Sequence, residues 1–201
     1  PTTFELTFEG PFFYERGKGF DWAWQTTYFN GVKWKGKKAP ELPLLQPEKV
    51  SELPLALTFN EAYRYELDGE GEAGGVPAWV LRFEPSEGFR DKAVYAGKVY
   101  IGKADFSLRR VVSRQLNLTG EVQSVDETTD FSEVAAPDGG PPLLLPVTTR
   151  GQTILRTFSR TTTLERTTDL MEIRLDPGDY ESLRAAALSG DQGMVRDTDA
   201  G

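Results

Sequence analysis

Hydrophobic and polar side chains alternate with a period of two residues along most of the chain. Phe4, Leu6 and Phe8 are separated by polar residues, and a similar alternation places Trp79, Leu81 and Phe83 on one side of a later segment. Because successive side chains of an extended strand point to opposite faces, this pattern is typical of strands with one buried face. It therefore predicts a mainly β protein.

The alternation predicts a series of strands in the middle and second half of the chain. The segments are residues 63–67, 78–84, 93–101, 106–116, 121–131, 143–151, 153–163 and 164–175. The glycine-rich residues 68–75 and the short segment 102–105 are expected to form turns between strands. Threonine is abundant in the last segments, and its branched β-carbon favours extended backbone. We expect these strands to pair in order, as an antiparallel meander.

An aromatic segment near the N-terminus predicts a β-hairpin. It contains Trp22, Trp24 and Trp34, and it includes the dipeptide Asn30-Gly31. Asparagine and glycine both tolerate positive φ, which a two-residue hairpin turn requires. We therefore expect residues 21–34 to form a hairpin around this dipeptide.

Two segments depart from the strand pattern. Residues 39–54 contain four prolines, which have no amide hydrogen to donate to a sheet, so this segment is predicted to be a connecting loop. Residues 179–188 follow the dipeptide Pro177-Gly178 and have an alanine-rich centre of high helix propensity. They predict the one convincing helix. The resulting fold class is a large curved antiparallel sheet, an open or half β-barrel, with few helices.

Composition sets the size and class of the protein. The chain has 201 residues, of which 38% are hydrophobic and 27% charged, so it is globular and holds enough apolar material for one sizeable core. We expect one sheet domain over residues 1–177. Residues 178–201 then form a C-terminal helix and a polar tail that leads to a neighbouring domain of a longer protein.

The inventory of side chains excludes several kinds of chemistry. The chain contains no cysteine and no histidine, so disulfides, zinc or haem ligation by these residues, thiol nucleophiles and triads with an imidazole base are excluded. The net charge is −8, with 31 acidic and 23 basic residues, which argues against nonspecific binding to a nucleic acid backbone. We expect no enzymatic activity, no cofactor and no metal site.

Two acidic clusters are candidates for calcium binding or for a pair of catalytic carboxylates. The clusters are Asp68, Glu70 and Glu72, which alternate with glycine, and Asp126, Glu127 and Asp130. The first lacks the full spacing of a calcium loop, and nothing in the sequence indicates a raised pKa in the second. Solvated turns or strand faces are the favoured interpretation. A hydrolase that uses Asp126 or Asp130 is the least favoured function.

Basic residues form two further candidate sites. Lysines at positions 33, 35, 37 and 38 lie beside Trp34 and would suit single-stranded nucleic acid or an anionic membrane surface. Arg156, Arg160 and Arg166 would suit an anion. The negative net charge weakens the first interpretation, and outward lysines also protect an edge hairpin from aggregation. For both groups the favoured interpretation is a charged, solvated face.

The apolar face of the predicted sheet raises the main functional question. A strongly curved antiparallel sheet with few helices must bury this face against a second sheet, against itself as a barrel, or against a ligand. The side chains expected to line an apolar concavity are Trp79, Leu81, Phe83, Tyr95, Val99 and Ile101. Two interpretations remain open, an ordinary self-filled core and a ligand-binding groove, and most such apolar stripes are core.

The order of these segments resembles the periplasmic lipoprotein-carrier family, which includes the carrier that sorts outer-membrane lipoproteins. The resemblance covers roughly residues 28–177, and its most specific element is residues 95–110, an outward strand, a Lys-Ala-Asp turn and a returning strand. The other matching segments are residues 28–34, 62–67, 78–85, 143–146 and 170–175. None of these segments is a catalytic signature.

This resemblance implies a periplasmic, non-enzymatic carrier or sensor that shelters acyl chains, or the lipid anchor of a lipoprotein, on its concave apolar face. Its partners would be an acyl chain or a lipidated protein and the other domains of the parent chain. Family members carry helices that gate the groove, whereas this chain offers one helix at its far end. The alternative is a protein-interaction module without lipid cargo, which presents Trp22, Trp24 and Trp34 to a partner.

Overall fold

The structure is a computed structural model of the 201-residue chain. It describes residues 5–15, 19–23, 25–35, 62–89, 94–136, 139–158, 160–175, 177–189 and 194–196. The chain divides into two compact units, one made of residues 1–57 and 176–201 and the other of residues 58–175. The predicted sheet domain, residues 1–177, thus spans the second unit and the N-terminal part of the first.

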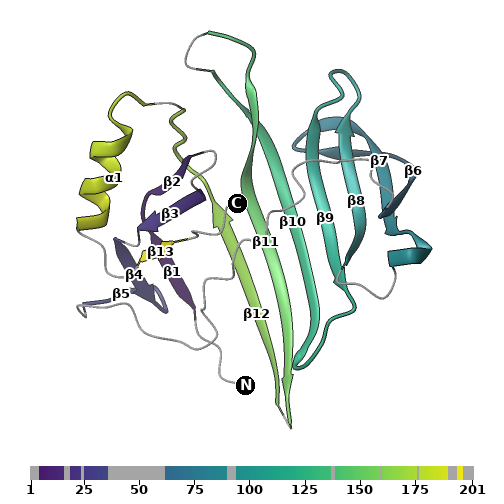
Figure 1. The fold of residues 1–201 in the computed structure, drawn as a ribbon, viewed down its shortest axis with the longest axis horizontal. Coiled ribbons are helices and arrows are strands. Elements are labelled where there is room, and N and C mark those ends of the chain that lie inside the picture. Colours follow the sequence, from purple (N-terminus) through teal and green to yellow (C-terminus); the bar gives the residue numbers. More distant parts are fainter. Residues whose placement is uncertain are drawn as a thin grey trace. The chain divides into compact units, whose positions relative to one another are not determined.

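The second unit is one antiparallel sheet of seven strands (Figure 1). The strands are β6 (Tyr63–Ala73), β7 (Val76–Pro85), β8 (Val94–Gly102), β9 (Leu108–Leu116), β10 (Val122–Val134), β11 (Leu143–Thr157) and β12 (Arg160–Asp169), and the short helix η1 (Glu87–Phe89) follows β7. Each strand pairs with its neighbours in sequence, from β6 at one edge to β12 at the other. The predicted mainly β fold and antiparallel meander are therefore confirmed, and the sheet is not closed into a barrel.

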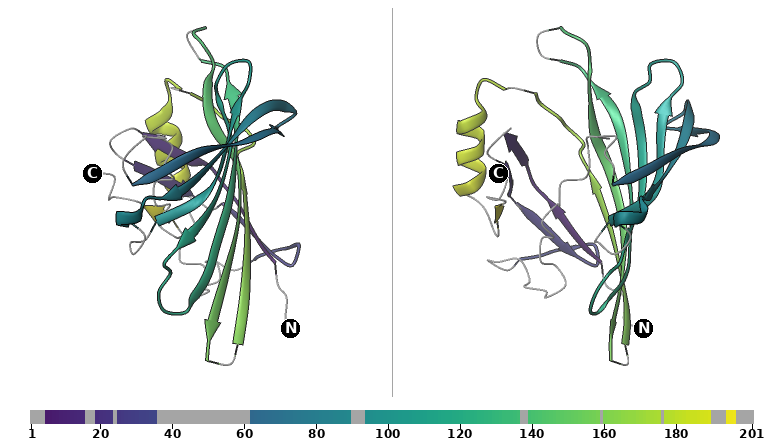
Figure 2. Two further views of the ribbon diagram at one scale, coloured as in Figure 1. Left: turned by 90° about the vertical axis from the view of Figure 1, so that its right-hand side faces the viewer. Right: turned by 45° about the vertical axis from the view of Figure 1, so that its right-hand side comes forward.

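The sheet is strongly twisted. In Figure 2, β6 and β7 run obliquely across the direction of β11 and β12. The pairing register shifts after Leu67 in β6, after Tyr100 in β8 and after Asp130 in β10. Such irregularities increase the local right-handed twist of a sheet. The open, twisted sheet agrees with the predicted half-barrel form.

Two predicted turns are wrong in position. The turn predicted at residues 68–75 is confined to Gly74 and Gly75, with φ of 59° and 76°, because the preceding glycines stay in the ladder of β6. The break predicted after residue 151 is absent, since β11 continues through Gly151 as a single strand. The chain turns instead at Phe158, whose φ is 42°. Phenylalanine is not a turn residue, so the sequence carries no signal for this turn.

The first unit contains two three-stranded sheets and one helix. The elements are β1 (Leu6–Glu9), β2 (Phe12–Glu15), β3 (Gly19–Ala23), β4 (Thr26–Phe29), β5 (Val32–Lys33), α1 (Tyr180–Ser189) and β13 (Met194–Arg196). The first sheet has the order β1-β4-β5 and the second the order β13-β3-β2, and all pairs are antiparallel.

Two local predictions are confirmed in this unit. Asn30 and Gly31 have φ of 49° and 75° and form the two-residue turn between β4 and β5. The predicted helix at residues 179–188 corresponds to α1, whose first turn is closed by the hydrogen bond from Leu183 N to Asp179 O. The proline-rich loop predicted at residues 39–54 lies outside the described residues. Of the helices that the structure describes, none has the length and apolar character needed to cross a membrane.

Candidate functional site

The two faces of the seven-stranded sheet carry different side chains. Directly paired residues of an antiparallel ladder share a face, so the register assigns side chains to one face or the other. Leu81 pairs with Val99, and this side of the sheet is named the apolar face. The next pair, Arg82 with Lys98, lies on the opposite side, which is named the charged face.

All six residues predicted to line an apolar concavity lie on the apolar face. They are Trp79, Leu81 and Phe83 on β7 and Tyr95, Val99 and Ile101 on β8. Val99 is fully buried and Phe83 retains 6% of its exposure, while the other four are half-buried. The register thus places the apolar side chains of β7 beside those of β8.

Aromatic side chains fill one corner of the apolar face. The ring of Phe83 lies 5.9 Å from that of Tyr63, edge to face, and 6.3 Å from that of Tyr65. The hydroxyl of Tyr63 accepts a hydrogen bond of 3.3 Å from the backbone N–H of Tyr95. Burial raises the pKa of Tyr65, and the neighbouring Tyr63 adds to this shift. This corner is packed like a protein core by its own side chains.

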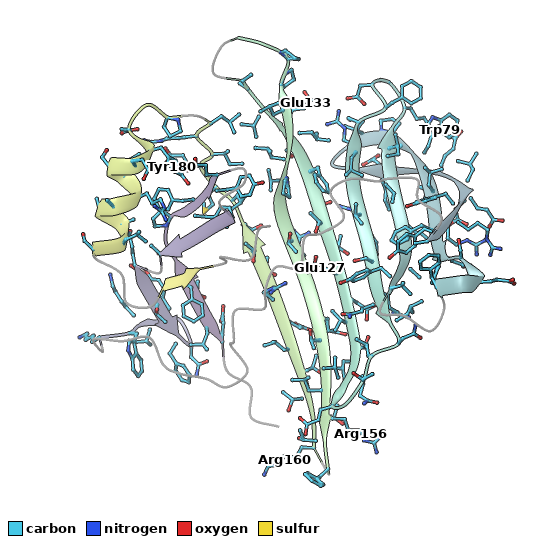
Figure 3. All side chains as sticks on the ribbon, viewed as in Figure 1. Trp79, Glu127, Glu133, Arg156, Arg160 and Tyr180 are labelled. Atoms are coloured by element: carbon cyan, nitrogen blue, oxygen red, sulfur yellow. The ribbon has the colours of Figure 1, made fainter. Side chains whose placement is uncertain are left out.

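Trp79, which is labelled in Figure 3, pairs with Ile101 of β8. The Lys103 Nζ atom is 4.3 Å from the centroid of the Trp79 ring, and it also forms an ion pair with Glu70. A cation over an indole ring is attracted by the negative face of the ring. The Trp79 side chain is therefore held on the apolar face with its outer side covered by Lys103.

Two carboxylates of the first acidic cluster form ion pairs with lysines. Glu70 pairs with Lys103, and Asp68 Oδ2 lies 2.8 Å from Lys98 Nζ. The hydrogen bond from Lys98, reinforced by its charge, lowers the pKa of Asp68. Within the described part of the chain, no group of three or more acidic residues is arranged to hold a metal ion.

A polar row crosses the apolar face on the other half of the sheet. The register aligns Ser113, Glu127, Gly151 and Arg166 across β9, β10, β11 and β12. Arg166 Nη2 donates a hydrogen bond of 3.1 Å to Glu127 Oε2. Gly151 lies between them, and a Cβ at this position would be 3.8 Å from Glu127 Oε2. This row borders the apolar cluster.

Sequence reasoning missed the Glu127–Arg166 pair because the two residues are 39 positions apart. It had grouped Glu127 with Asp126 and Asp130, and Arg166 with Arg156 and Arg160. Strand alternation divides both groups between the two faces. The only signal for the pair is the pairing register of three strands, which the sequence pattern leaves undetermined.

The charged face is crossed by ion pairs between strands. Asp130 accepts hydrogen bonds from Arg110 at 2.5 Å and from Arg150 at 3.2 Å, and Asp126 accepts one from Arg114 at 2.6 Å. Three further pairs on this face are Arg82–Glu66, Arg64–Glu84 and Lys98–Asp68. These acidic side chains are therefore compensated by basic side chains of other strands in the sheet.

Asp126 shows how this pairing acts on a carboxyl group. Partial burial by itself would raise the pKa of Asp126, but hydrogen bonds from Ser124 and Arg114 outweigh it, so the pKa is lowered. A carboxyl group held in its ionised form is unsuited to donate a proton as a general acid.

Of the tryptophans predicted to bind a partner, Trp22 and Trp34 belong to different parts of the first unit. Trp34 follows β5 and is 38% exposed, near Phe29 and Val32, which are 39% and 70% exposed. Trp22 lies in β3, which belongs to the other small sheet, where its backbone pairs with that of Phe12. Trp24 lies outside the described residues. The predicted hairpin over residues 21–34 is therefore wrong in extent, because residues 21–23 belong to β3 and the hairpin is formed by β4 and β5.

Comparisons of the chain with protein-family models, with curated proteins and with solved structures find no match. They bear neither for nor against the resemblance to lipoprotein carriers, which stays a prediction. The function is therefore inferred from the two faces of the seven-stranded sheet.

Proposed function

We propose that this chain is a non-enzymatic lipid-binding domain, which holds acyl chains or the lipid anchor of a lipoprotein on the apolar face of its seven-stranded sheet. The observation that carries the proposal is the placement of all six predicted apolar residues on one face of an open sheet. The opposite face is compensated by ion pairs. An acyl chain gains about 0.8 kcal/mol for each methylene removed from water, so a contiguous apolar surface suits it.

The borders of the apolar cluster suit an amphipathic ligand. Leu81, Val99 and Ile101 form its centre. The polar row that contains Glu127 lies beside this centre and continues through Ser113 and Gly97 to Phe83 at the aromatic corner. A hydrocarbon tail over the centre would reach charged groups only at the margin of the cluster. The head group of the lipid would then stay in the aqueous phase, which avoids the cost of burying its polar atoms.

The resemblance to periplasmic lipoprotein carriers supports a location in the bacterial cell envelope for this domain. In that setting the ligand is a lipid or a lipidated protein that crosses an aqueous compartment. Other domains of the parent protein are further proposed partners.

A titration with a dansyl-labelled fatty acid tests the proposal. Leu81→Glu and Ile101→Glu place a charge on the apolar face, and we expect each to weaken fatty-acid binding at least about tenfold. The matched control is Val112→Glu, which places the same charge on the opposite face, where Val112 pairs with Lys98. This control is expected to bind as tightly as the unmodified protein, and circular dichroism checks that each variant is folded.

The outcomes separate a binding surface from a core. Equal binding by Leu81→Glu and the control would contradict the proposal, as would a failure of the unmodified protein to bind. Unfolding of both apolar-face variants, with the control folded, would show that these residues are core. Native mass spectrometry after organic extraction of the purified protein provides a second test, since a bound lipid is expected to copurify.

The exposed side chains of the β4–β5 hairpin favour a second function, protein interaction. Phe29, Val32 and Trp34 are exposed by 39%, 70% and 38%. If the chain is an interaction module, a photo-reactive amino acid at position 32 should crosslink to a protein partner in cell extract. The fatty-acid titration would then be negative for the unmodified protein.

A further inference from the structure

The turn between β11 and β12 carries a fully exposed aromatic side chain. Phe158 has a relative exposure of 104% and a φ of 42°. Left-handed backbone is strained for a bulky residue and is normally occupied by glycine or asparagine. Phe158 therefore stabilises neither a core nor its own turn, and this combination calls for a functional explanation.

Two arginines flank this turn, one on each side of the sheet. Arg156 pairs with Thr161, on the charged face, while Arg160 pairs with Thr157, on the apolar face. Figure 3 shows both at the end of the sheet where β11 turns into β12. Every other lysine or arginine that the structure describes between residues 62 and 169 forms an ion pair. In the same described set, Arg156 and Arg160 form none.

We propose that this hairpin tip, defined as Arg156, Phe158 and Arg160, docks on an anionic lipid surface. The phenylalanine ring would enter the interface between head groups and acyl chains, where aromatic residues are favoured. The two guanidinium groups would meet lipid phosphates, which they bind through two parallel hydrogen bonds. A single projecting ring flanked by two cations is complementary to such a surface.

The small size of the tip argues against a folded protein as its partner. A stable protein interface buries at least about 1,000 Å² in total, which a tight turn does not supply. A lipid surface needs no shape complementarity, because it adapts to an inserted side chain. Binding then depends on the buried apolar area and on local charge.

The net charge of −8 does not oppose this contact at the tip. β11 has 15 residues and therefore extends for about 50 Å, whereas charges are screened over about 8 Å at physiological salt. The charge within reach of the lipid is thus that of the tip. Glu121 is brought to the same end of the sheet, since its carbonyl accepts a hydrogen bond of 2.7 Å from Arg156 N.

The chain contains an internal control at the opposite end of the sheet. Phe106, in the turn between β8 and β9, has a φ of 56° and is 75% exposed. Its nearby cations are paired, Lys103 with Glu70 and Arg109 with Asp105. Phe106 thus shares the strain and exposure of Phe158 but lacks uncompensated positive charge.

Co-sedimentation of the full chain with lipid vesicles tests the proposal. The probes are vesicles of equimolar phosphatidylcholine and phosphatidylglycerol, and vesicles of phosphatidylcholine alone. We expect binding to the anionic vesicles to exceed binding to the neutral ones and to fall with added salt. Replacing both Arg156 and Arg160 by glutamine should weaken it about 25-fold, since each basic residue near such a surface contributes about fivefold.

Phe158→Gly separates a membrane role from a structural one. Glycine accommodates the positive φ, so the variant should be as stable as the unmodified protein or more stable, while its binding to anionic vesicles falls about tenfold. Phe106→Gly should leave vesicle binding unchanged. Glu121→Gln should strengthen it about fivefold, because it removes the acidic group at the tip.

Three results would overturn the proposal. They are equal binding to neutral and anionic vesicles, unchanged binding of both tip variants, and an equal loss of binding in Phe106→Gly. A crosslink from position 158 to a protein, together with no vesicle binding, would also contradict the proposal, because it would indicate that the partner is a protein. The fatty-acid titration keeps this inference distinct from the proposed function, because Phe158→Gly is expected to bind the fatty acid normally.

Discussion

The two faces of the seven-stranded sheet are built on the same strands but are stabilised in different ways. On the apolar face, Val99 is fully buried and Phe83 packs against two tyrosine rings. On the charged face, Asp130 joins two arginines from neighbouring strands, and similar pairs continue across the sheet. The apolar face is therefore stabilised by packed apolar side chains, whereas the charged face combines ion pairs with the small buried side chains Ala78, Val80 and Val94.

This difference indicates where a binding function belongs. Ion pairs between solvent-exposed side chains are satisfied by one another and by water, so the charged face needs no partner. Half-buried apolar side chains such as Leu81 and Ile101 gain free energy from any further removal from water. The apolar face is therefore the surface on which a ligand with hydrocarbon chains is best stabilised.

The largest expected effect is the loss of packing on the apolar face. Phe83→Ala should lower the free energy of unfolding by about 3–5 kcal/mol, because it removes a buried ring and leaves a cavity beside Tyr63 and Tyr65. Urea denaturation measures this difference. The control is Arg82→Ala on the charged face, whose solvent-exposed ion pair with Glu66 should contribute little to stability. Equal losses in both variants would remove the contrast between the faces.

An intermediate loss of stability is expected on replacing Asp130, the carboxylate of the charged face that accepts hydrogen bonds from two arginines. Asp130→Asn should cost about 1–2 kcal/mol, because Arg110 and Arg150 both lose a charged acceptor. Glu84→Gln is the matched control, since Glu84 is more exposed and its loss should cost less than about 0.5 kcal/mol. Denaturation at low and high salt checks the origin of the effect. A salt-independent loss in Asp130→Asn would argue against an electrostatic cause.

The smallest expected effect is the contribution of Asp126 to acid stability. Because its pKa is lowered in the folded protein, its contribution is fully present above the unfolded-state value of about 3.9. It is lost as the pH falls below that value and through the folded-state pKa. Solvent screening keeps it under about 1 kcal/mol, as Asp126 is only partly buried.

Asp126→Asn should therefore flatten the dependence of stability on pH below about 4 and leave other proton-linked effects unchanged. Thermal melts between neutral and acidic pH measure this slope. An unchanged slope would mean that the hydrogen bonds from Ser124 and Arg114 do not favour the ionised form.

The sequence by itself determined that the chain forms an antiparallel meander and which residues alternate between its two faces. The alternation around Trp79, Leu81 and Phe83 is a local pattern, and it indicates directly that one face is buried. The turn at Asn30-Gly31 was also predictable, because positive φ is a property of these residue types. In each case the information lies within a few neighbouring residues.

Only the tertiary structure decided which distant residues meet. The Glu127–Arg166 pair and the position of the strained turn at Phe158 both depend on how the strands pair. Register is set by contacts summed over whole strands, since a shift of one residue would exchange the two faces. A local pattern predicts that a strand forms, but the partner of each residue is determined only when the strands pair.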